Sequence, residues 1–308
     1  MAAYLELHYQ NKLKERVEAA KALLESCRVC PRHCGINRLA GETGKCRTAR
    51  QAVVSSYGPH YGEEAPLVGR HGSGTIFFTN CNLRCRFCQN YSISQLGEGE
   101  EASREEIAGM MFTLQAKGCH NINLVSPTHV VPQILEAVEI AAKMGLHLPL
   151  IYNSGGYDSV ETLKILDGII DIYMPDMKYS DEKTAREFSG VADYPSINRL
   201  AVEEMHRQVG DLQVNEEGIA TRGLLVRHLV LPNNLSGTRE IVHFLTREIS
   251  QNTYLNVMAQ YHPCYEALQI PQLARGIFRH EFLEAAQLAH EAGLNRLDRA
   301  RPVIVRLA

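Results

Sequence analysis

Three cysteines near the middle of the first half of the chain have the spacing to hold an iron-sulfur cluster. Cys81, Cys85 and Cys88 stand in the segment TNCNLRCRFCQN at C-x3-C-x2-C spacing, directly after a short apolar run at 74–79. Cubane clusters are held by cysteine thiolates and usually take four of them. Three thiolates on one loop therefore leave one iron without a protein ligand. The alternative, a structural zinc site, needs four ligands, usually two pairs of cysteines.

An iron that lacks a protein ligand is available for chemistry. It can bind the amino and carboxylate groups of S-adenosylmethionine (SAM) and pass an electron into the sulfonium, and homolysis then yields methionine and a 5'-deoxyadenosyl radical. That radical abstracts hydrogen from carbon. The three cysteines therefore predict a 4Fe-4S cluster and SAM as cofactors, while no side chain can be assigned as a catalytic residue.

A second group of cysteines lies nearer the N-terminus. It has C-x2-C-x3-C-x11-C spacing and consists of Cys27, Cys30, Cys34 and Cys46. Four thiolates can close a tetrahedral zinc site or complete the ligand set of a second 4Fe-4S cluster, and four uncoordinated thiols are a third reading. A site closed by four protein ligands cannot bind SAM, so its expected role is folding support, electron relay or partner docking. Cys119 and Cys264 stand alone and are expected to be buried apolar residues.

The scaffold that must position these cysteines can be predicted from the rest of the chain. Six short apolar runs alternate with helix-patterned segments, at 74–79, 122–126, 148–153, 169–174, 224–231 and 254–260. This alternation predicts repeated βα units, and the uniformly apolar runs predict strands covered on both faces. The expected fold class is α/β, a partial (β/α)6 barrel with an N-terminal Cys-rich extension. Its functional mouth is expected at the carboxyl ends of the strands.

Local signals predict where several helices begin and end. Ser103 with Glu106 and Asp158 with Glu161 have the spacing of a capping box. Glycines are expected to end three helices, at Gly118, Gly145 and Gly168. Residues 181–223 predict a long crossover with two helices and a glycine turn, and a last helix should end near Gly293.

The chain divides into three predicted parts. Residues 1–70 are expected to form a helix and a four-Cys metal-binding extension, residues 71–270 the barrel, and residues 271–308 a C-terminal helical extension. Within the first part, the segment at 57–69 has too many prolines and glycines for regular structure. The net charge of -3 is spread along the chain, which gives no indication of a nucleic-acid partner. No run approaches the roughly 20 apolar residues of a membrane span, and the N-terminus does not resemble a secretion signal. A cytoplasmic location is expected.

The motif and its surroundings resemble a known family. The segment GEEAPLVGRHGSGTIFFTNCNLRCRFCQN and the following QNYSIS look like the radical SAM superfamily, most closely the pyruvate formate-lyase activating enzyme-like proteins. The resemblance runs from about Cys27 to about Pro263. It implies a partial six-strand barrel, one 4Fe-4S cluster and SAM. A reductant such as flavodoxin or ferredoxin is the expected electron-donating partner.

Two segments are expected to contact SAM. The turn NSGGY places adjacent glycines at the barrel mouth, where the backbone can approach a ligand at Asn153, Ser154 and Gly155; an ordinary βα turn is the alternative. Asp176 and Lys178 resemble the Asp-x-Lys of activating enzymes, whose lysine meets the methionine carboxylate. For this pair the alternative is a solvated charge pair at a strand end.

The resemblance also has a weaker part and a departure. Tyr261 and His262 resemble the tyrosine-histidine pair that lies near the adenine in activating enzymes. Those enzymes carry a Gly-Gly-Glu element after the second strand that binds the methionine amino group, whereas this chain has SPTHVVP at 126–132. Thr128 and His129 are candidates to replace it through a side-chain oxygen or nitrogen, and the assignment is left open.

The substrate is less clear than the first half-reaction. Hydrogen abstraction from a protein or peptide is the main hypothesis, including activation of a glycyl-radical partner enzyme. Direct modification of a small metabolite and a non-catalytic iron-sulfur electron carrier or zinc-stabilised scaffold are the alternatives. Tyr173, Met174 and Arg227 are expected to face the barrel, either shaping the substrate site or serving as packing and local ion pairs.

Overall fold

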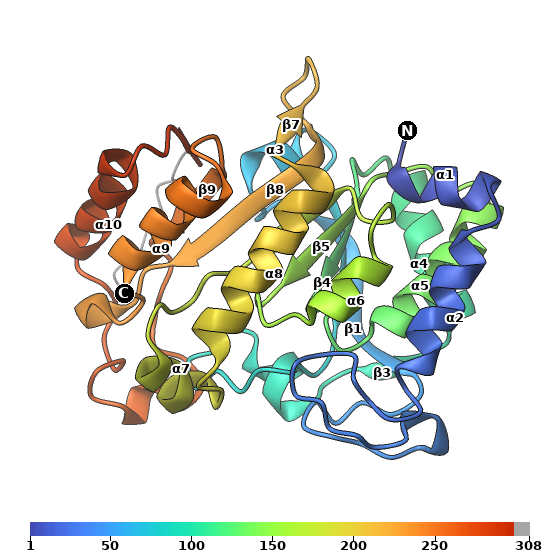
Figure 1. Cartoon of the computed structure of the whole chain (residues 1–308), viewed down its shortest axis with the longest axis horizontal. Coiled ribbons are helices and arrows are strands. Elements are labelled where there is room, and N and C mark those ends of the chain that lie inside the picture. Colours follow the sequence, from blue (N-terminus) through green and yellow to red (C-terminus); the bar gives the residue numbers. More distant parts are fainter. Residues whose placement is uncertain (299–308) are drawn as a thin grey trace.

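One twisted sheet organises the molecule, and the computed structural model describes residues 1–298 of it (Figure 1). The strands run in the order β10-β9-β8-β6-β5-β4-β2-β1-β3, and β7 pairs with β8. From β2 to β10 along this order all neighbours are parallel, whereas β1 runs antiparallel to both β2 and β3. The result is an unclosed α/β barrel, which confirms the predicted fold class.

The strands fall where the apolar runs predict them. All six expected strands are present as β2 (Ser73–Phe78), β4 (Ile122–Val125), β5 (Leu150–Ser154), β6 (Ile172–Pro175), β8 (Ala220–Leu229) and β9 (Tyr254–Met258). The remaining strands are β1 (Ala52–His60), β3 (Glu100–Ala102), β7 (Gln213–Val214) and β10 (Arg296–Leu297). Nearly every residue of β2, β4, β5 and β6 is buried, as expected for parallel strands covered on both faces.

Helices follow the strands and cover the sheet. They are α4 (Arg104–Ala116), α5 (Val131–Lys143), α6 (Val160–Ile165), α7 (Glu182–Ser189), α8 (Tyr194–Val209), α9 (Thr238–Phe244) and α10 (Arg279–Glu291). The helices α7 and α8 with the intervening Gly190 confirm the predicted long crossover, and α10 ends before Gly293 as expected. In Figure 1, α8 crosses in front of the sheet, while the coil that carries the N-terminal cysteines lies at the lower edge beside β3.

The N-terminal part differs from its prediction. It holds two helices rather than one, α1 (Ala3–Tyr9) and α2 (Leu13–Ala22), and both pack against α5. The segment predicted to be irregular contains half of β1 and the short helix α3 (Ala65–Val68). Pro59 is tolerated within β1 because β3 pairs only with Ala52–Val54, which leaves the second half of β1 with one neighbouring strand.

The helix-end signals are correct with one exception. Ser103 and Glu106 form the predicted capping box, and Gly118, Gly145 and Gly168 follow helices with positive φ. Asp158 does not cap α6, whose N-cap is Ser159. Its buried carboxylate instead accepts hydrogen bonds from Thr128, Tyr152 and Ser154. Sequence spacing alone could not distinguish this core role from a cap.

The helices are too short or too polar to span a membrane in the described part of the chain.

Candidate functional site

The three motif cysteines meet the strand ends in one cleft. The loop after β2 carries Cys81, Cys85 and Cys88, and all three line a cavity of about 200 Å³. The opposite wall comes from the carboxyl ends of β4, β5, β6, β8 and β9. This is the mouth at which barrels of parallel strands gather their functional residues.

Each thiol of the trio has a hydrogen-bond donor nearby. The Leu83 amide donates to Cys81 Sγ at 3.4 Å, Ser189 Oγ lies 3.0 Å from Cys85 Sγ, and Ser94 Oγ lies 3.1 Å from Cys88 Sγ. Burial, and to a lesser extent the neighbouring Cys85, raise the pKa of the Cys81 thiol to about 12. The Cys81 thiol is therefore neutral, and a metal centre that binds it as a thiolate must displace its proton.

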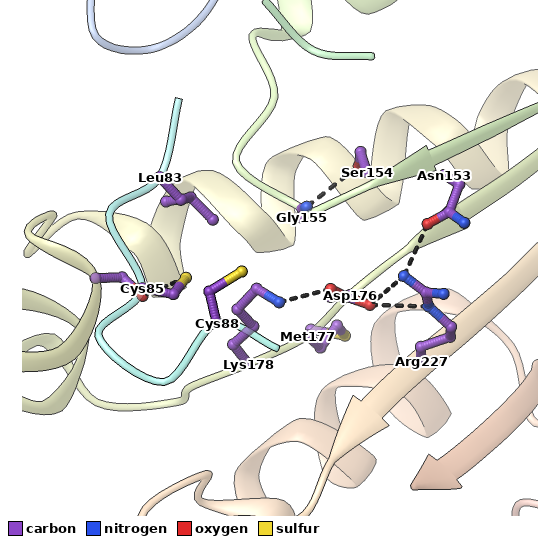
Figure 2. Close-up of polar contacts among 12 residues, drawn as sticks. Leu83, Cys85, Cys88, Asn153, Ser154, Gly155, Asp176, Met177, Lys178 and Arg227 are labelled. Carbon is purple, nitrogen blue, oxygen red and sulfur yellow. Dashed lines mark hydrogen bonds and ion pairs between the residues drawn. The ribbon is translucent and has the colours of Figure 1, made fainter. Parts of the chain in front are cut away.

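A row of charged groups faces the cysteines across the cleft. Lys178 Nζ lies 2.5 Å from Asp176 Oδ2, and Arg227 Nε donates to Asp176 Oδ1 at 2.9 Å. A second Arg227 nitrogen donates to Asn153 Oδ1 at 2.7 Å. Figure 2 shows these side chains as a row that leads from Cys85 and Cys88 through Lys178 and Asp176 to Arg227 and Asn153. Arg227 is thus a local ion-pair partner that also lines the cleft.

Burial and pairing set the charges of this row. The side chains of Asp176 and Lys178 are each 14% exposed, so the alternative of a solvated charge pair is wrong. Burial would raise the pKa of Asp176, but Arg227 and Lys178 hold it below its ordinary value. Burial likewise opposes the charge on Lys178, yet the Asp176 carboxylate raises the pKa of Lys178. All three groups are charged when the cleft holds only protein.

The helix α8 fixes the loops that follow β5 and β6. Tyr194 Oη lies 2.9 Å from the carbonyl oxygens of both Gly155 and Asp176. Asn198 Nδ2 donates to the carbonyls of Gly156 and Asp176 at 2.8 and 3.0 Å. These contacts hold the turn at Asn153 and the Asp176 strand end at a fixed separation.

Most of the residues predicted to contact SAM line the cleft, but His262 does not. Those that line the cleft are Asn153, Ser154, Gly155, Asp176 and Lys178. His262 is exposed and outside the cleft lining, where its Nδ1 lies 3.1 Å from Gln89 Nε2. Tyr261 is buried and donates to the Leu273 carbonyl.

Neither candidate replacement for the Gly-Gly-Glu element lines the cleft. Thr128 donates to Asp158, and His129 Nε2 lies 3.0 Å from the Thr79 carbonyl, so both side chains are buried away from the cleft. Ser126, held at φ 59° after β4, lines the cleft instead. Tyr173 and Met174 are fully buried, and the Tyr173 hydroxyl donates to Gln208 rather than facing the cleft.

Other cleft residues carried no sequence signal. Gln89 and Gln260 are exposed at the rim, and Gln89 donates to the Gln260 carbonyl at 2.9 Å.

Cys264 is half-buried rather than buried, whereas Cys119 is buried as expected. Burial raises the pKa of the Cys264 thiol, and Cys88 raises it further. No spacing links Cys264 to the motif, because 176 positions separate it from Cys88.

The four N-terminal cysteines also come together. Cys27, Cys30, Cys34 and Cys46 line one small pocket. Burial, with smaller contributions from the three neighbouring thiols, raises the pKa of Cys30 to about 12. Across the described part of the chain, no three His, Cys, Asp or Glu side chains converge closely enough to form a single-ion site.

The segment with these four cysteines is attached to the loop of the trio. Arg32 Nε donates to the Asn82 carbonyl at 2.8 Å, and a second Arg32 nitrogen donates to the Gly190 carbonyl at 3.1 Å. Arg47 donates to Asn80 Oδ1 at 3.0 Å. The segment that carries the four N-terminal cysteines is therefore in contact with the loop of the trio.

An unclosed α/β barrel with three cysteines on the loop after its first parallel strand defines a class of cluster-bearing enzymes. The family model described as the Radical SAM superfamily matches residues 75–207, which include the trio, Asp176 and Lys178. The chain belongs to the radical SAM superfamily. This superfamily is a family of enzymes and implies a 4Fe-4S cluster and SAM.

Two relatives from Methanocaldococcus jannaschii match most of the chain. The uncharacterized protein MJ0674 is 31% identical over 94% of this chain and 82% of its own length. The uncharacterized protein MJ0808 is 26% identical over 87% of this chain and 81% of its own length. Among solved structures, HydG, a maturase of the [FeFe]-hydrogenase, matches with a TM-score of 0.51 at 14% identity. That match covers 72% of this chain and 51% of HydG, and it supports the fold alone.

The residues present fit the implied cofactors. The trio supplies three sulfur ligands, each with a hydrogen-bond donor that would stabilise a thiolate. Lys178 supplies an ammonium within the same cleft. Apolar side chains pack beside the trio, since Leu83 and Phe87 are buried in one core cluster with Cys85.

Proposed function

We propose that the protein is an oxidoreductase of the pyruvate formate-lyase activating enzyme type that abstracts hydrogen from a protein or peptide substrate. Activation of a glycyl-radical enzyme is one such reaction. The observation that carries the proposal is the single cleft that joins Cys81, Cys85 and Cys88 to the buried Lys178–Asp176 pair. When bound, the cluster would supply the electron that cleaves SAM reductively.

The chain's own residues would bind and orient the cofactors. The trio would hold the cluster, and Lys178 would pair with the methionine carboxylate while Asp176 and Arg227 keep its ammonium in place. The turn at Asn153, Ser154 and Gly155, which lines the same cleft, would contact SAM. Leu83 and Phe87 would exclude water from the cluster side.

The polar rim favours a peptide over a small metabolite. Gln89, Asn90 and Gln260 are exposed and line the outer part of the cleft. An amide side chain can donate and accept at once, which suits the alternating donors and acceptors of a peptide backbone. A flavodoxin or ferredoxin in the reducing cytoplasm would supply the electron.

The N-terminal cysteines would form a second metal centre. The four thiols line one pocket, which supports a shared ligand and argues against four independent thiols. Four thiolates suit either zinc or a second 4Fe-4S cluster. A single zinc ion would require the four sulfurs to draw closer together than they lie here.

The first experiment tests SAM cleavage. The protein is reconstituted anaerobically, its iron and zinc are counted, and 5'-deoxyadenosine is quantified after addition of dithionite and SAM. We expect product from the wild type and from Cys119→Ala, which removes a buried thiol outside both groups, and none from Cys85→Ala. A wild type that binds a cluster but leaves SAM intact would support the electron-carrier alternative.

A second experiment identifies the class of substrate. Reactions with deuterated cell protein should transfer deuterium into 5'-deoxyadenosine, whereas deuterated metabolites below 1 kDa should not. Deuterium transfer from the metabolite fraction alone would contradict the peptide proposal and leave SAM cleavage standing.

A further inference from the structure

In the pocket of the N-terminal cysteines, the backbone lies very close to a cysteine sulfur. Besides the four cysteines, its wall includes Arg38, His129 and Gly44. A Cβ atom on Gly44 would lie 2.7 Å from Cys34 Sγ, so only glycine permits this contact with the sulfur. The backbone is tied around the same pocket, because the Cys27 amide donates to the Ile36 carbonyl and the Gly35 amide to the Cys27 carbonyl.

Arg38 is a buried cation, and no carboxylate of the described residues neutralises it. It is 1% exposed, and it donates from Nε to the Ala49 carbonyl at 3.0 Å and from Nη1 to the His129 carbonyl at 2.7 Å. Its Nη2 is buried without a hydrogen-bond partner, and no carboxylate within residues 1–298 pairs with it. A buried charge is costly unless it is paired, so this guanidinium indicates an anion beside it.

His129 gives a second, independent indication at the same pocket. It is 1% exposed, and its Nε2 must donate to the Thr79 carbonyl at 3.0 Å because a carbonyl oxygen only accepts. Its Nδ1 is buried without a partner among the described residues. Buried polar atoms are nearly always hydrogen-bonded. In this tautomer Nδ1 is an acceptor, so it does not itself pair with an anion. Together with the Arg38 Nη2 donor it makes two buried polar atoms of the pocket lining that no described residue satisfies.

We propose that Arg38 is the counter-charge of an anionic metal-thiolate centre held by Cys27, Cys30, Cys34 and Cys46, and that its Nη2 donates to a ligating sulfur. This inference rests on the second metal centre proposed above. Four thiolates outweigh the charge of Zn²⁺, and an iron-sulfur centre with four thiolates is also anionic, so the role of Arg38 is the same for both metals. Arg38 is a positioning residue that orients ligands from outside the coordination shell.

The test counts metal at the N-terminal site alone. The background is the full chain with Cys81→Ala, Cys85→Ala and Cys88→Ala, so that any bound metal reports the other four cysteines. In this background Arg38→Met should retain metal about 10- to 100-fold more weakly against a chelator, as is usual when a residue that supports metal ligands is lost. Arg38→Lys should fall between Arg38→Met and the unchanged arginine.

The matched control is Arg28→Met. Arg28 lies in the same segment, but its side chain is 51% exposed and faces Glu161. It should retain metal like the background protein. Equal retention by Arg38→Met and Arg28→Met would overturn the role of Arg38. A background protein that binds neither zinc nor iron would overturn the second centre itself, while the 5'-deoxyadenosine assay of the wild type tests the radical function separately.

A double-mutant cycle distinguishes charge pairing from simple packing. Arg38→Met is combined with Cys46→Ser, which removes one metal ligand, and the free energy of unfolding is measured for all four proteins. If Arg38 balances the charge of the centre, its replacement should destabilise the protein less when Cys46 is absent. An equal effect of Arg38→Met in both backgrounds would mean that Arg38 only packs and binds carbonyls.

Discussion

At the scale of single residues, the cleft depends on one carboxylate that serves two cations. Asp176 pairs with Lys178 through one oxygen and with Arg227 through the other, and the three side chains are between 14% and 18% exposed. The carboxylate fixes the ammonium that would meet SAM. It also links that ammonium to the Asn153 turn through Arg227.

Replacement of Asp176 should therefore destabilise the protein strongly. We expect Asp176→Asn to lower the free energy of unfolding by about 3 kcal/mol, because two buried cations lose their shared anion. The control is Asp167→Asn, since Asp167 is 39% exposed in its pair with Arg207 and should cost less than about 1 kcal/mol. Urea unfolding measures both. Equal losses for the two variants would show that the Asp176 pairs contribute no more than a surface ion pair.

At the scale of elements, the turn between β5 and α6 is held tightly against β6. Gly156 has φ 75°, and a Cβ atom there would collide with the Asp176 carbonyl and with Asn198 Nδ2. The carbonyl of Gly156 accepts the hydrogen bond from Asn198 that joins this turn to α8. Glycine is therefore needed both for the backbone conformation and for the close approach.

Two glycine substitutions separate these requirements. Gly145 also has positive φ, at 93°, but a Cβ atom there meets nothing within 4 Å. Gly145→Ala should cost about 1 kcal/mol from backbone strain alone, whereas Gly156→Ala should cost about 3 kcal/mol or more because it adds a steric clash. Thermal unfolding of both variants tests this. If Gly156→Ala destabilised the protein no more than Gly145→Ala does, the turn would not be packed tightly against the end of β6.

The sequence allowed the parallel strands to be predicted because each is buried on both faces and so reads as a continuous apolar run. The strand β1 could not be predicted from the sequence, because Pro59 resembles a strand breaker. Pro59 is compatible with β1 only because the outer edge of β1 is unpaired at that position. The trio and Lys178 follow from local motifs. Ser189, Tyr194 and Asn198 carry no local signal, because they reach the site only through the packing of α7 and α8.

At the scale of the whole molecule, the N-terminal segment is bound to the mouth of the barrel. Arg32 joins the Asn82 carbonyl, beside Cys81, to the Gly190 carbonyl after α7. The segment that carries the N-terminal cysteines thus helps to hold the loop of Cys81, Cys85 and Cys88 in place. Loss of this attachment should loosen the loop of the trio.

Arg32→Met tests this support. After timed exposure to a chelator, its yield of 5'-deoxyadenosine should fall about 10-fold further than that of the wild type, because residues that orient metal-binding loops affect metal retention. Arg28→Met, which alters the same segment without contact to that loop, should behave like the wild type. Identical losses in Arg32→Met and Arg28→Met would mean that the loop holds its cluster without help from the N-terminal segment.

The Arg32 contact to Gly190 also bears on how the protein is made. Cys46 is synthesised 144 positions before Gly190, so at ribosomal rates of about 5–20 residues per second the four N-terminal thiols wait on the order of 10 s before this anchor exists. During that interval the nascent chain presents four thiols that are accessible to metal donors and to oxidants. Early metal loading would protect them, and the finished barrel would then close over a segment that is already ordered.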